Sequence, residues 1–259
     1  MTAGLSPGPE PALAAAAAMV FVDDLGAPVL AAEDAHHLVH VLRLRHDETV
    51  IASDGAGGWV PCRLWGPAGG GSSPGGPSKQ RGEPVSLVVA GSPSAQPGPD
   101  PVITVAFVPT KGERPEWVTQ KLTELGVDRI VPLRSNRSVV RWEGPRGDRA
   151  VDRLRRVARE ASAQCRRTWL PEVTPVTDLD GLAALAGTRP CLARMGGGRP
   201  GLTPPVIAVG PEGGWDDDEV SRWGDGVGLG PTVLRAETAA VAAGTLLCAL
   251  RGGVIGPLA

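Results

Sequence analysis

Two glycine-containing segments near the C-terminus carry the residues whose types and spacing could do chemistry. The first is Gly210-Pro211-Glu212-Gly213-Gly214, and the second is Leu229-Gly230-Pro231-Thr232-Val233-Leu234-Arg235-Ala236-Glu237-Thr238. Each follows a short apolar run typical of a buried strand, Val206–Val209 and Val227–Leu229. Glycines at strand ends let the backbone approach a ligand closely. Together the two segments predict a pocket at the carboxyl edge of a sheet.

The second segment places Arg235 and Glu237 at the start of an almost entirely apolar helix, expected from Ala239 to Leu250. Charges at the entrance of a buried helix usually have partners, so this segment is harder to explain as a simple turn. The first segment is also compatible with a simple turn before a helix, since the acidic run Trp215–Glu219 is typical of a first helical turn. No Lys-Ser or Lys-Thr follows its glycines, which excludes a phosphate-binding loop.

From residue 102 to residue 259, strand and helix patterns alternate, which is typical of a parallel sheet with crossover helices. The helix expected at 148–164 has apolar residues at three-to-four spacing and arginines on its other faces. The expected strands are 102–108, 129–133, 190–194, 206–209 and 227–229, and the expected helices are 115–125, 148–164, 179–186 and 239–250.

Residues 19–91 predict a separate, strand-rich domain. A helix at 34–44 precedes strands at 48–53, 59–65 and 85–90, with a hairpin-type turn at 54–58. The Gly/Ser/Pro-rich stretch 66–84 predicts a flexible loop within this domain, and the Pro-rich stretch 92–101 a linker. Residues 1–18 contain no Lys or Arg and predict a disordered or variable leader rather than a signal peptide or membrane span.

The scattered cysteines and the histidines favour no metal site. The chain has 259 residues, a net charge of −2 and four cysteines without metal-ligand spacing, which indicates free thiols in a reducing, cytoplasmic location. His36, His37 and His40 could suggest a metal, but no acidic or cysteine partner recurs at suitable spacing, so surface histidines are the preferred interpretation.

The segment from Arg129 to Arg167 is strongly basic, with twelve arginines against four acidic residues. A solvated helix face explains a charge run of this kind. An arginine-rich face in an otherwise neutral chain is also the pattern expected for contact with a phosphate backbone. Arg pairs with phosphate through two hydrogen bonds and stacks on bases.

The strings GPEGG and LGPTVLRAETAA resemble the cofactor-binding signature of the SPOUT methyltransferases, specifically the RsmE type. The resemblance extends in order over about residues 19 to 251. The further matching stretches are Lys111–Arg114 leading into Trp117–Val127, Ser135–Val140, Glu160–Gln164 and His36–Arg45.

The resemblance implies a fold, an activity and partners. The fold is an α/β SPOUT fold with a C-terminal trefoil knot, preceded by a small PUA-like β-barrel that helps to hold RNA. The activity is transfer of a methyl group from S-adenosyl-L-methionine to atom N3 of a uridine in 16S ribosomal RNA of the small subunit. The partners are that RNA and a second copy of the chain in a homodimer, without a membrane or a metal.

The resemblance also assigns site residues. Arg235 is expected to stabilise negative charge on the uridine carbonyls, and Glu237 to orient Arg235 or the cofactor. The expected cofactor-binding residues are Gly210, Pro211, Glu212, Gly213, Gly214, Leu229, Gly230, Leu234, Arg235 and Thr238. The expected RNA-binding residues are Arg43, Arg45, Lys111, Arg114, Arg137, Gln164, Arg166 and Arg167. The sequence departs from the family pattern at two positions: many relatives have Glu at the place of Ala163 and Gly at the place of Arg166.

Two other functions stay open at this point. One is the same methyl transfer to a different RNA, such as a transfer RNA. The other is a non-catalytic RNA-binding factor in ribosome assembly that keeps the pocket only for stability. Retention of Arg235, Glu237 and GPEGG argues against the second, because a dead site has no need for charges that are costly to bury.

Overall fold

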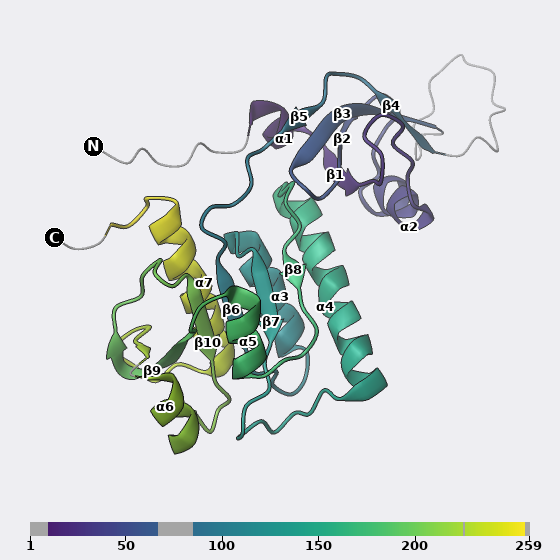
Figure 1. The fold of residues 1–259 in the computed structure, drawn as a ribbon. Helices are drawn as coiled ribbons and strands as arrows, with labels where there is room; N and C mark the ends of the chain where they lie inside the picture. Colours follow the sequence, from purple (N-terminus) through teal and green to yellow (C-terminus); the bar gives the residue numbers. More distant parts are fainter. Residues whose placement is uncertain (1–9, 67–84, 225, 257–259) are drawn as a thin grey trace, which may run out of the picture. The chain divides into compact units, whose positions relative to one another are not determined.

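The computed structural model describes residues 10–66, 85–224 and 226–256, which divide into two compact units (Figure 1). The N-terminal unit contains the described residues of Pro7–Gly98 together with Ser162–Trp169. The C-terminal unit contains Pro99–Ala161 and the described residues from Leu170 onward. Most of the loop expected at 66–84, and residues 1–9 of the expected leader, lie outside the described residues.

The N-terminal unit is built on a five-stranded sheet. Its pairing order is β1-β2-β3-β4, with β5 added to β3; β1 and β2 are parallel and the other pairs antiparallel. Val50, Val60 and Leu64 of this sheet pack on Leu38 in one apolar cluster. The strands are β1 Ala18–Phe21, β2 Thr49–Ser53, β3 Gly58–Trp65, β4 Ser86–Val89 and β5 Ser94–Ala95.

Several expectations for the N-terminal unit need correction. Residues 10–18 are not disordered: Pro11–Ala15 form helix α1, and the Leu13 side chain is fully buried. The stretch 92–101 is not only a linker, because β5 pairs with β3. Within the described residues β1 and β4 are edge strands that do not pair with each other, so the sheet is open where a closed barrel was expected.

The helix expected at 34–44 starts earlier and changes type. Ala32–His36 form α2, and His37–Val41 continue it as one π-helical turn. Leu38 points into the apolar cluster of the sheet, whereas His36 and His40 are exposed and their rings lie 4.6 Å apart. Arg43 has a positive φ of 56°, which ends the helical run.

The C-terminal unit contains a five-stranded sheet of order β8-β7-β6-β10-β9, in which all recorded pairs are parallel. This confirms the α/β fold class. The central strand β6 pairs on both sides, with Val105 opposite Ile130 of β7 and Ile207 of β10. The strands are β6 Thr104–Phe107, β7 Arg129–Pro132, β8 Glu172–Val173, β9 Cys191–Gly198 and β10 Val206–Val209.

Helices cover both faces of this sheet (Figure 1). Successive strand residues point to opposite faces, and Val105 and Phe107 accordingly pack with α3, α4 and α7, whereas Ala106 and Val108 pack with α5. Near the α3–α7 contact, a Cβ added at Gly244 would lie 2.6 Å from the end of the Leu122 side chain, so any larger residue would force that side chain to move. The helices are α3 Arg114–Leu125, α4 Gly144–Cys165, α5 Leu179–Ala186, α6 Asp217–Trp223 and α7 Ala236–Arg251.

Helix α4 is amphipathic, as its spacing predicts, and begins four residues before the expected start. Val151, Leu154, Ala158 and Ala161 are buried, whereas most of its arginines are exposed. The strand expected at 227–229 is wrong: Val227 makes only isolated bridges, to Ala193 and Gly198. The glycines around it allow a close backbone approach but do not continue a ladder.

Candidate active site

The carboxyl ends of three neighbouring parallel strands bring the chemistry-bearing segments to one edge of the sheet. Lys111 follows β6, Ser135–Arg137 follows β7, and Gly210–Gly214 follows β10. Parallel strands point the same way, so the loops after them share an edge, which is where open α/β sheets bind ligands. The location that the sequence predicts for the first glycine segment is therefore confirmed.

Arg114, at the start of α3, faces acidic groups of both glycine-containing segments. Its Nη1 atom lies 3.8 Å from Glu212 Oε1, and its Nε atom lies 3.7 Å from Glu237 Oε1. The Arg114 side chain is half exposed, so each ion pair contributes only about 0–1 kcal/mol. The main effect of these ion pairs is on position rather than on stability, because one guanidinium contacts both the GPEGG loop and the first turn of α7.

The segment after β7 is hydrogen-bonded to the GPEGG loop and to α6. Arg137 Nη1 donates to the Gly213 carbonyl at 3.0 Å. The Asn136 backbone N–H donates to Glu219 Oε1 at 3.0 Å, and Asn136 Nδ2 donates to Asp216 Oδ2 at 2.5 Å. The two loops therefore hold each other in place, which a ligand site at a sheet edge requires.

A capping box starts α6 directly after the GPEGG loop. Asp216 Oδ1 accepts from the Glu219 backbone N–H at 2.7 Å, and Glu219 Oε2 accepts from the Asp216 N–H at 3.0 Å. The Glu219 N–H lowers the pKa of the Asp216 carboxyl below its ordinary value, and the Asn136 amide adds to the effect. The acidic run is a helix start, as the sequence predicts.

Glu237 has an unsatisfied acceptor. Its side chain is only 15 % exposed, and within the described residues its Oε2 atom is buried without a hydrogen-bond donor. A buried acceptor without a donor costs about 1–3 kcal/mol. A ligand that donates a hydrogen bond to this oxygen would remove that cost, so the structure supports a ligand-contacting role for Glu237.

Arg235 precedes α7 as its N-cap residue, with an exposed side chain. Its guanidinium makes no ion pair with any described residue, so it is available to a ligand. Leu234 beside it is half-buried, whereas Val233 is 85 % exposed. The structure therefore places Arg235 and Glu237 at the same end of α7, with Arg114 paired to the glutamate.

Close packing at one position and a positive φ at another explain why two residues of the first segment are glycines. A Cβ at Gly210 would lie 3.0 Å from the Trp215 ring, and Gly214 has a φ of +69° that favours glycine. The Trp215 indole N–H donates to the Ala193 carbonyl at 3.1 Å, which ties the loop to β9.

A third glycine cluster, Gly196–Gly198 at the end of β9, is not predicted from the sequence. The Gly198 N–H donates to the Gly226 carbonyl at 3.0 Å, and the Gly228 N–H donates to the Gly198 carbonyl at 2.8 Å. A Cβ at Gly197 would lie 2.5 Å from the Val227 backbone. This cluster therefore holds the start of the second segment. The signal that could have indicated it is three consecutive glycines after an apolar strand.

The expected RNA-binding residues belong to both units. Lys111, Arg114 and Arg137 lie at the sheet edge of the C-terminal unit, as described above. Arg43 and Arg45 are exposed on the N-terminal unit, and Gln164 is exposed near the end of α4.

Arg166 has a structural role, and its expected RNA contact stays a prediction. Its guanidinium donates to the backbone carbonyls of Ala16, Ala17 and Ala163 at 3.0, 3.0 and 2.8 Å. Partial burial lowers the pKa of Arg166 from its ordinary value. Its φ of +62° ends α4, which is the conformation that glycine adopts most easily. These three hydrogen bonds use three of the five N–H donors of the guanidinium.

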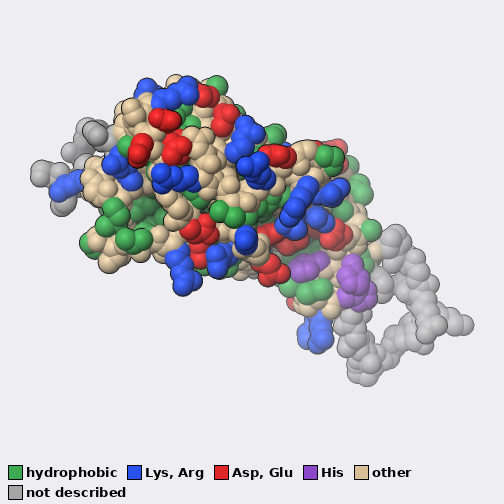
Figure 2. Space-filling model, turned by 90° about the horizontal axis from the view of Figure 1, so that it is seen from below, with side chains coloured by type: hydrophobic (Ala, Val, Ile, Leu, Met, Phe, Trp, Pro, Cys, Tyr) green, Lys and Arg blue, Asp and Glu red, His purple; other side chains and the backbone are tan. Residues whose placement is uncertain are grey.

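Within the described ranges there is no group of three or more His, Cys, Asp or Glu side chains able to hold a metal ion. No described helix is long and apolar enough to cross a membrane. The histidines gather on the surface, and on the face shown in Figure 2 basic side chains are interspersed with acidic ones.

The fold and the site define an α/β protein with a ligand site at the carboxyl edge of a parallel sheet, formed by glycine loops, arginines and two glutamates. Comparisons with known proteins agree. A family model described as "RNA methyltransferase domain" matches residues 97–248, and one described as "RNA methyltransferase PUA domain" matches residues 30–65.

Relatives and a solved structure extend the comparison. Ribosomal RNA small subunit methyltransferase E of Mycobacterium bovis is 30 % identical, covering 88 % of this chain and 89 % of that protein. The protein of the same name from Bacillus subtilis is 28 % identical, covering 80 % and 84 %. A Neisseria gonorrhoeae enzyme of that name, bound to S-adenosyl methionine, is 25 % identical with a TM-score of 0.70, covering 90 % of this chain and 97 % of that one. The chain therefore belongs to the RNA methyltransferase family, and its N-terminal unit contains a PUA-type domain.

Proposed function

We propose that this protein transfers the methyl group of S-adenosyl-L-methionine to atom N3 of a uridine in 16S ribosomal RNA. The observation that carries the proposal is the joining of the two glycine-containing segments: Arg114 faces Glu212 and Glu237, and Arg137 donates to Gly213. These segments also carry the resemblance to RsmE-type enzymes. The names of the relatives, ribosomal RNA small subunit methyltransferase E, supply the class of substrate.

The residues present fit S-adenosyl-L-methionine. Backbone groups of Gly210, Gly213 and Gly230 can hold an adenine without charged side chains, and the half-buried Leu229 and Leu234 offer apolar contact. The buried, unsatisfied Oε2 of Glu237 is an acceptor for a donor of the ligand. The remaining members of the proposed cofactor-binding set are Pro211, Glu212, Gly214, Arg235 and Thr238. The bound cofactor supplies an electrophilic methyl group on a sulfonium.

The protein's own residues position the uridine and stabilise charge. Uridine N3 carries a proton between two carbonyl groups, so it becomes a nucleophile only when that proton passes to water, and negative charge then spreads to the carbonyl oxygens. Arg235, which is exposed and makes no ion pair with the described residues, would stabilise this charge through hydrogen bonds. Glu237 orients the ligand, and Arg114 is a positioning residue because it holds Glu237.

The finer proposals follow from the resemblance. We infer a C-terminal trefoil knot and a homodimer that completes the site, both from the resemblance alone. We infer action on the assembled small subunit in the cytoplasm, without a metal. The proposed RNA contacts remain Arg43, Arg45, Lys111, Arg114, Arg137, Gln164, Arg166 and Arg167, of which Arg166 also holds backbone carbonyls of the N-terminal unit.

The test is methyl transfer from radiolabelled S-adenosyl-L-methionine to three substrates: unmodified small subunits, 16S RNA alone and total transfer RNA. We expect label in the small-subunit RNA. Label in transfer RNA alone would show that the substrate is transfer RNA, and methyl transfer would still be the reaction. Absence of cofactor binding, measured by calorimetry, would refute the proposed enzymatic function and favour a non-catalytic assembly factor.

A further inference from the structure

A basic groove lies on the C-terminal unit beside the site, and apart from Lys111 its residues have no role in the proposed function. It has a volume of about 780 Å³, within the range of about 300–1,000 Å³ typical of ligand pockets. Its walls come from the loop after β6, the segment after β7 and the first turns of α4. The groove residues that matter here are Lys111, Trp142, Arg146, Arg149, Arg153 and Arg156.

The four arginines of the groove line one face of α4. Their positions, 146, 149, 153 and 156, are separated by three, four and three residues, which places them on the same side of a helix. Like charges at this spacing repel one another, so the arrangement is unfavourable in the absence of an anion. The opposite face of α4 packs Leu154 and Ala158 into the core, so the arginines cannot rotate inward.

Few acidic groups neutralise this face. Arg153 pairs with Glu116, and the one acid lining the groove, Asp152, accepts from Arg155, which lies outside it, at 2.8 Å. Lys111, Arg146, Arg149 and Arg156 make no ion pair with any residue that the structure describes. The groove therefore presents four unpaired cations, which is the pattern of a site for a polyanion.

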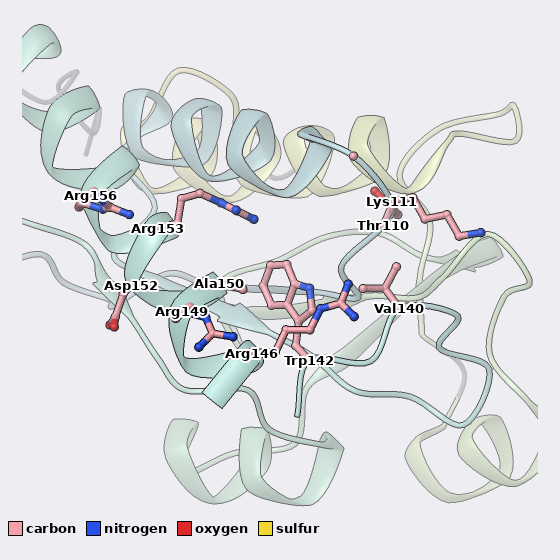
Figure 3. A pocket seen from close by; sticks show the side chains of 11 residues that line it. Thr110, Lys111, Val140, Trp142, Arg146, Arg149, Ala150, Asp152, Arg153 and Arg156 are labelled. Carbon is pink, nitrogen blue, oxygen red and sulfur yellow. The ribbon is translucent and has the colours of Figure 1, made fainter. Parts of the chain in front are cut away.

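An aromatic ring lies among these cations. The Trp142 side chain is partly buried against the core cluster, and its ring lies between the arginines of α4 and Lys111 (Figure 3). A ring held by packing on one side and open to a groove on the other is a stacking platform. Cations that track a backbone, together with an aromatic ring, form the combination that binds single-stranded nucleic acid.

We propose that this groove binds unpaired RNA next to the target uridine: Trp142 stacks on one base, and Lys111, Arg146, Arg149 and Arg156 hold the flanking phosphates. The proposal rests on the proposed function in taking RNA as the ligand. The segment from Lys111 to Arg114 joins the groove to the candidate cofactor site, since Lys111 lines the groove and Arg114 faces Glu212 and Glu237. The groove thus determines which RNA strand reaches the site.

The charge part is tested by fluorescence anisotropy of a labelled single-stranded RNA as the salt concentration is raised. The variant Arg146→Gln/Arg149→Gln should bind more weakly, and the slope of log affinity against log salt should become shallower by about 1.4, because each phosphate that is no longer neutralised accounts for about 0.7. The matched control is Arg189→Gln/Arg199→Gln, which removes two exposed charges of the same unit outside the groove. Equal slopes for the wild type and the groove variant would overturn the proposal.

The stacking part is tested with RNA that contains the fluorescent base 2-aminopurine, whose emission is quenched by stacking. Trp142→Ala should lose the quenching and weaken binding by about 5- to 100-fold, whereas Trp142→Phe should retain most of both. Trp117→Ala, at an exposed tryptophan outside the groove, is the control. Unchanged quenching in Trp142→Ala would refute a stacked base.

The measurements distinguish failure of the proposed function from failure of the groove proposal. Binding of S-adenosyl-L-methionine to the groove variants should equal that of the wild type, because no groove residue belongs to the proposed cofactor set. A wild-type protein that binds RNA through the groove but transfers no methyl group would refute the proposed function alone. Methyl transfer with normal RNA binding in both groove variants would refute the groove alone.

Discussion

Arg166 gives the sharpest stability prediction, because its side chain and its backbone can be tested separately. The guanidinium donates to three backbone carbonyls, two of these bonds being partly buried and one exposed. A hydrogen bond involving a charged group contributes about 1.5–3 kcal/mol when buried and less when exposed. The bonds share one group and are not additive, so Arg166→Ala should lower the free energy of unfolding by about 2–3 kcal/mol.

Arg166→Gly removes the same hydrogen bonds but relieves the left-handed backbone, whose φ is +62°. That conformation costs a non-glycine residue about 1–2 kcal/mol, and the greater freedom of glycine in the unfolded chain offsets about 0.4–1 kcal/mol of the gain. The glycine variant should therefore be more stable than the alanine variant by about 0.5–1 kcal/mol, yet less stable than the wild type.

The assay is urea unfolding of the wild type, both variants and an Arg166→Lys control, followed by circular dichroism. Lys keeps the charge but lacks the planar fork that reaches several carbonyls, so it should recover only part of the loss. Equal stability of Arg166→Ala and the wild type would refute the account of the hydrogen bonds. An alanine variant as stable as the glycine variant would refute the account of the backbone.

Three further predictions concern the core and the candidate site. Leu154→Ala, at a fully buried position, should cost about 2–5 kcal/mol of stability, measured by urea unfolding with the exposed Val139→Ala as control. Gly210→Ala should weaken cofactor binding about 10-fold by calorimetry, because its Cβ would lie 3.0 Å from the Trp215 ring and displace the loop; unchanged affinity would contradict this. The pKa of Asp216 is lower in the folded state than its ordinary value, so its stabilising effect is complete above the unfolded pKa, about 3.9, and is lost as the pH falls through the folded pKa. Asp216→Asn should therefore destabilise the protein at neutral pH but not at the lowest pH, and a pH-independent difference in thermal unfolding would contradict the assignment.

The sequence predicted the elements with strong periodicity and short, well-bounded apolar runs. The strands at 129–133 and 206–209 and the helix at 179–186 agree closely with β7, β10 and α5. The strand at 227–229 failed because a short apolar run with a glycine looks the same whether it joins a ladder or makes single bridges. Helix α1 was missed because alanine-rich sequence without charge resembles a leader, and only its buried Leu13 shows otherwise.

The candidate site was predicted in its location but not in its internal contacts. Glycine segments after strands indicate a sheet edge, and the parallel sheet places them there. The pairing of Arg114 with Glu237 depends on residues more than a hundred positions apart, which no local pattern encodes. The groove around Trp142 was missed for the same reason: the arginines of α4 are visible in the sequence, whereas the ring and Lys111 that complete the groove come from other segments.

The central claim is methyl transfer to uridine N3 with Arg235 as the charge-stabilising residue. The most direct measurement is nucleoside analysis of small-subunit RNA after reaction with radiolabelled S-adenosyl-L-methionine, comparing the wild type, Arg235→Ala and Arg235→Lys. The account predicts label in 3-methyluridine for the wild type and a loss of about 100-fold or more in Arg235→Ala. Arg235→Lys restores the charge without the planar guanidinium, so it should recover only part of that activity. Label in any other nucleoside, or full activity of Arg235→Ala, would contradict it.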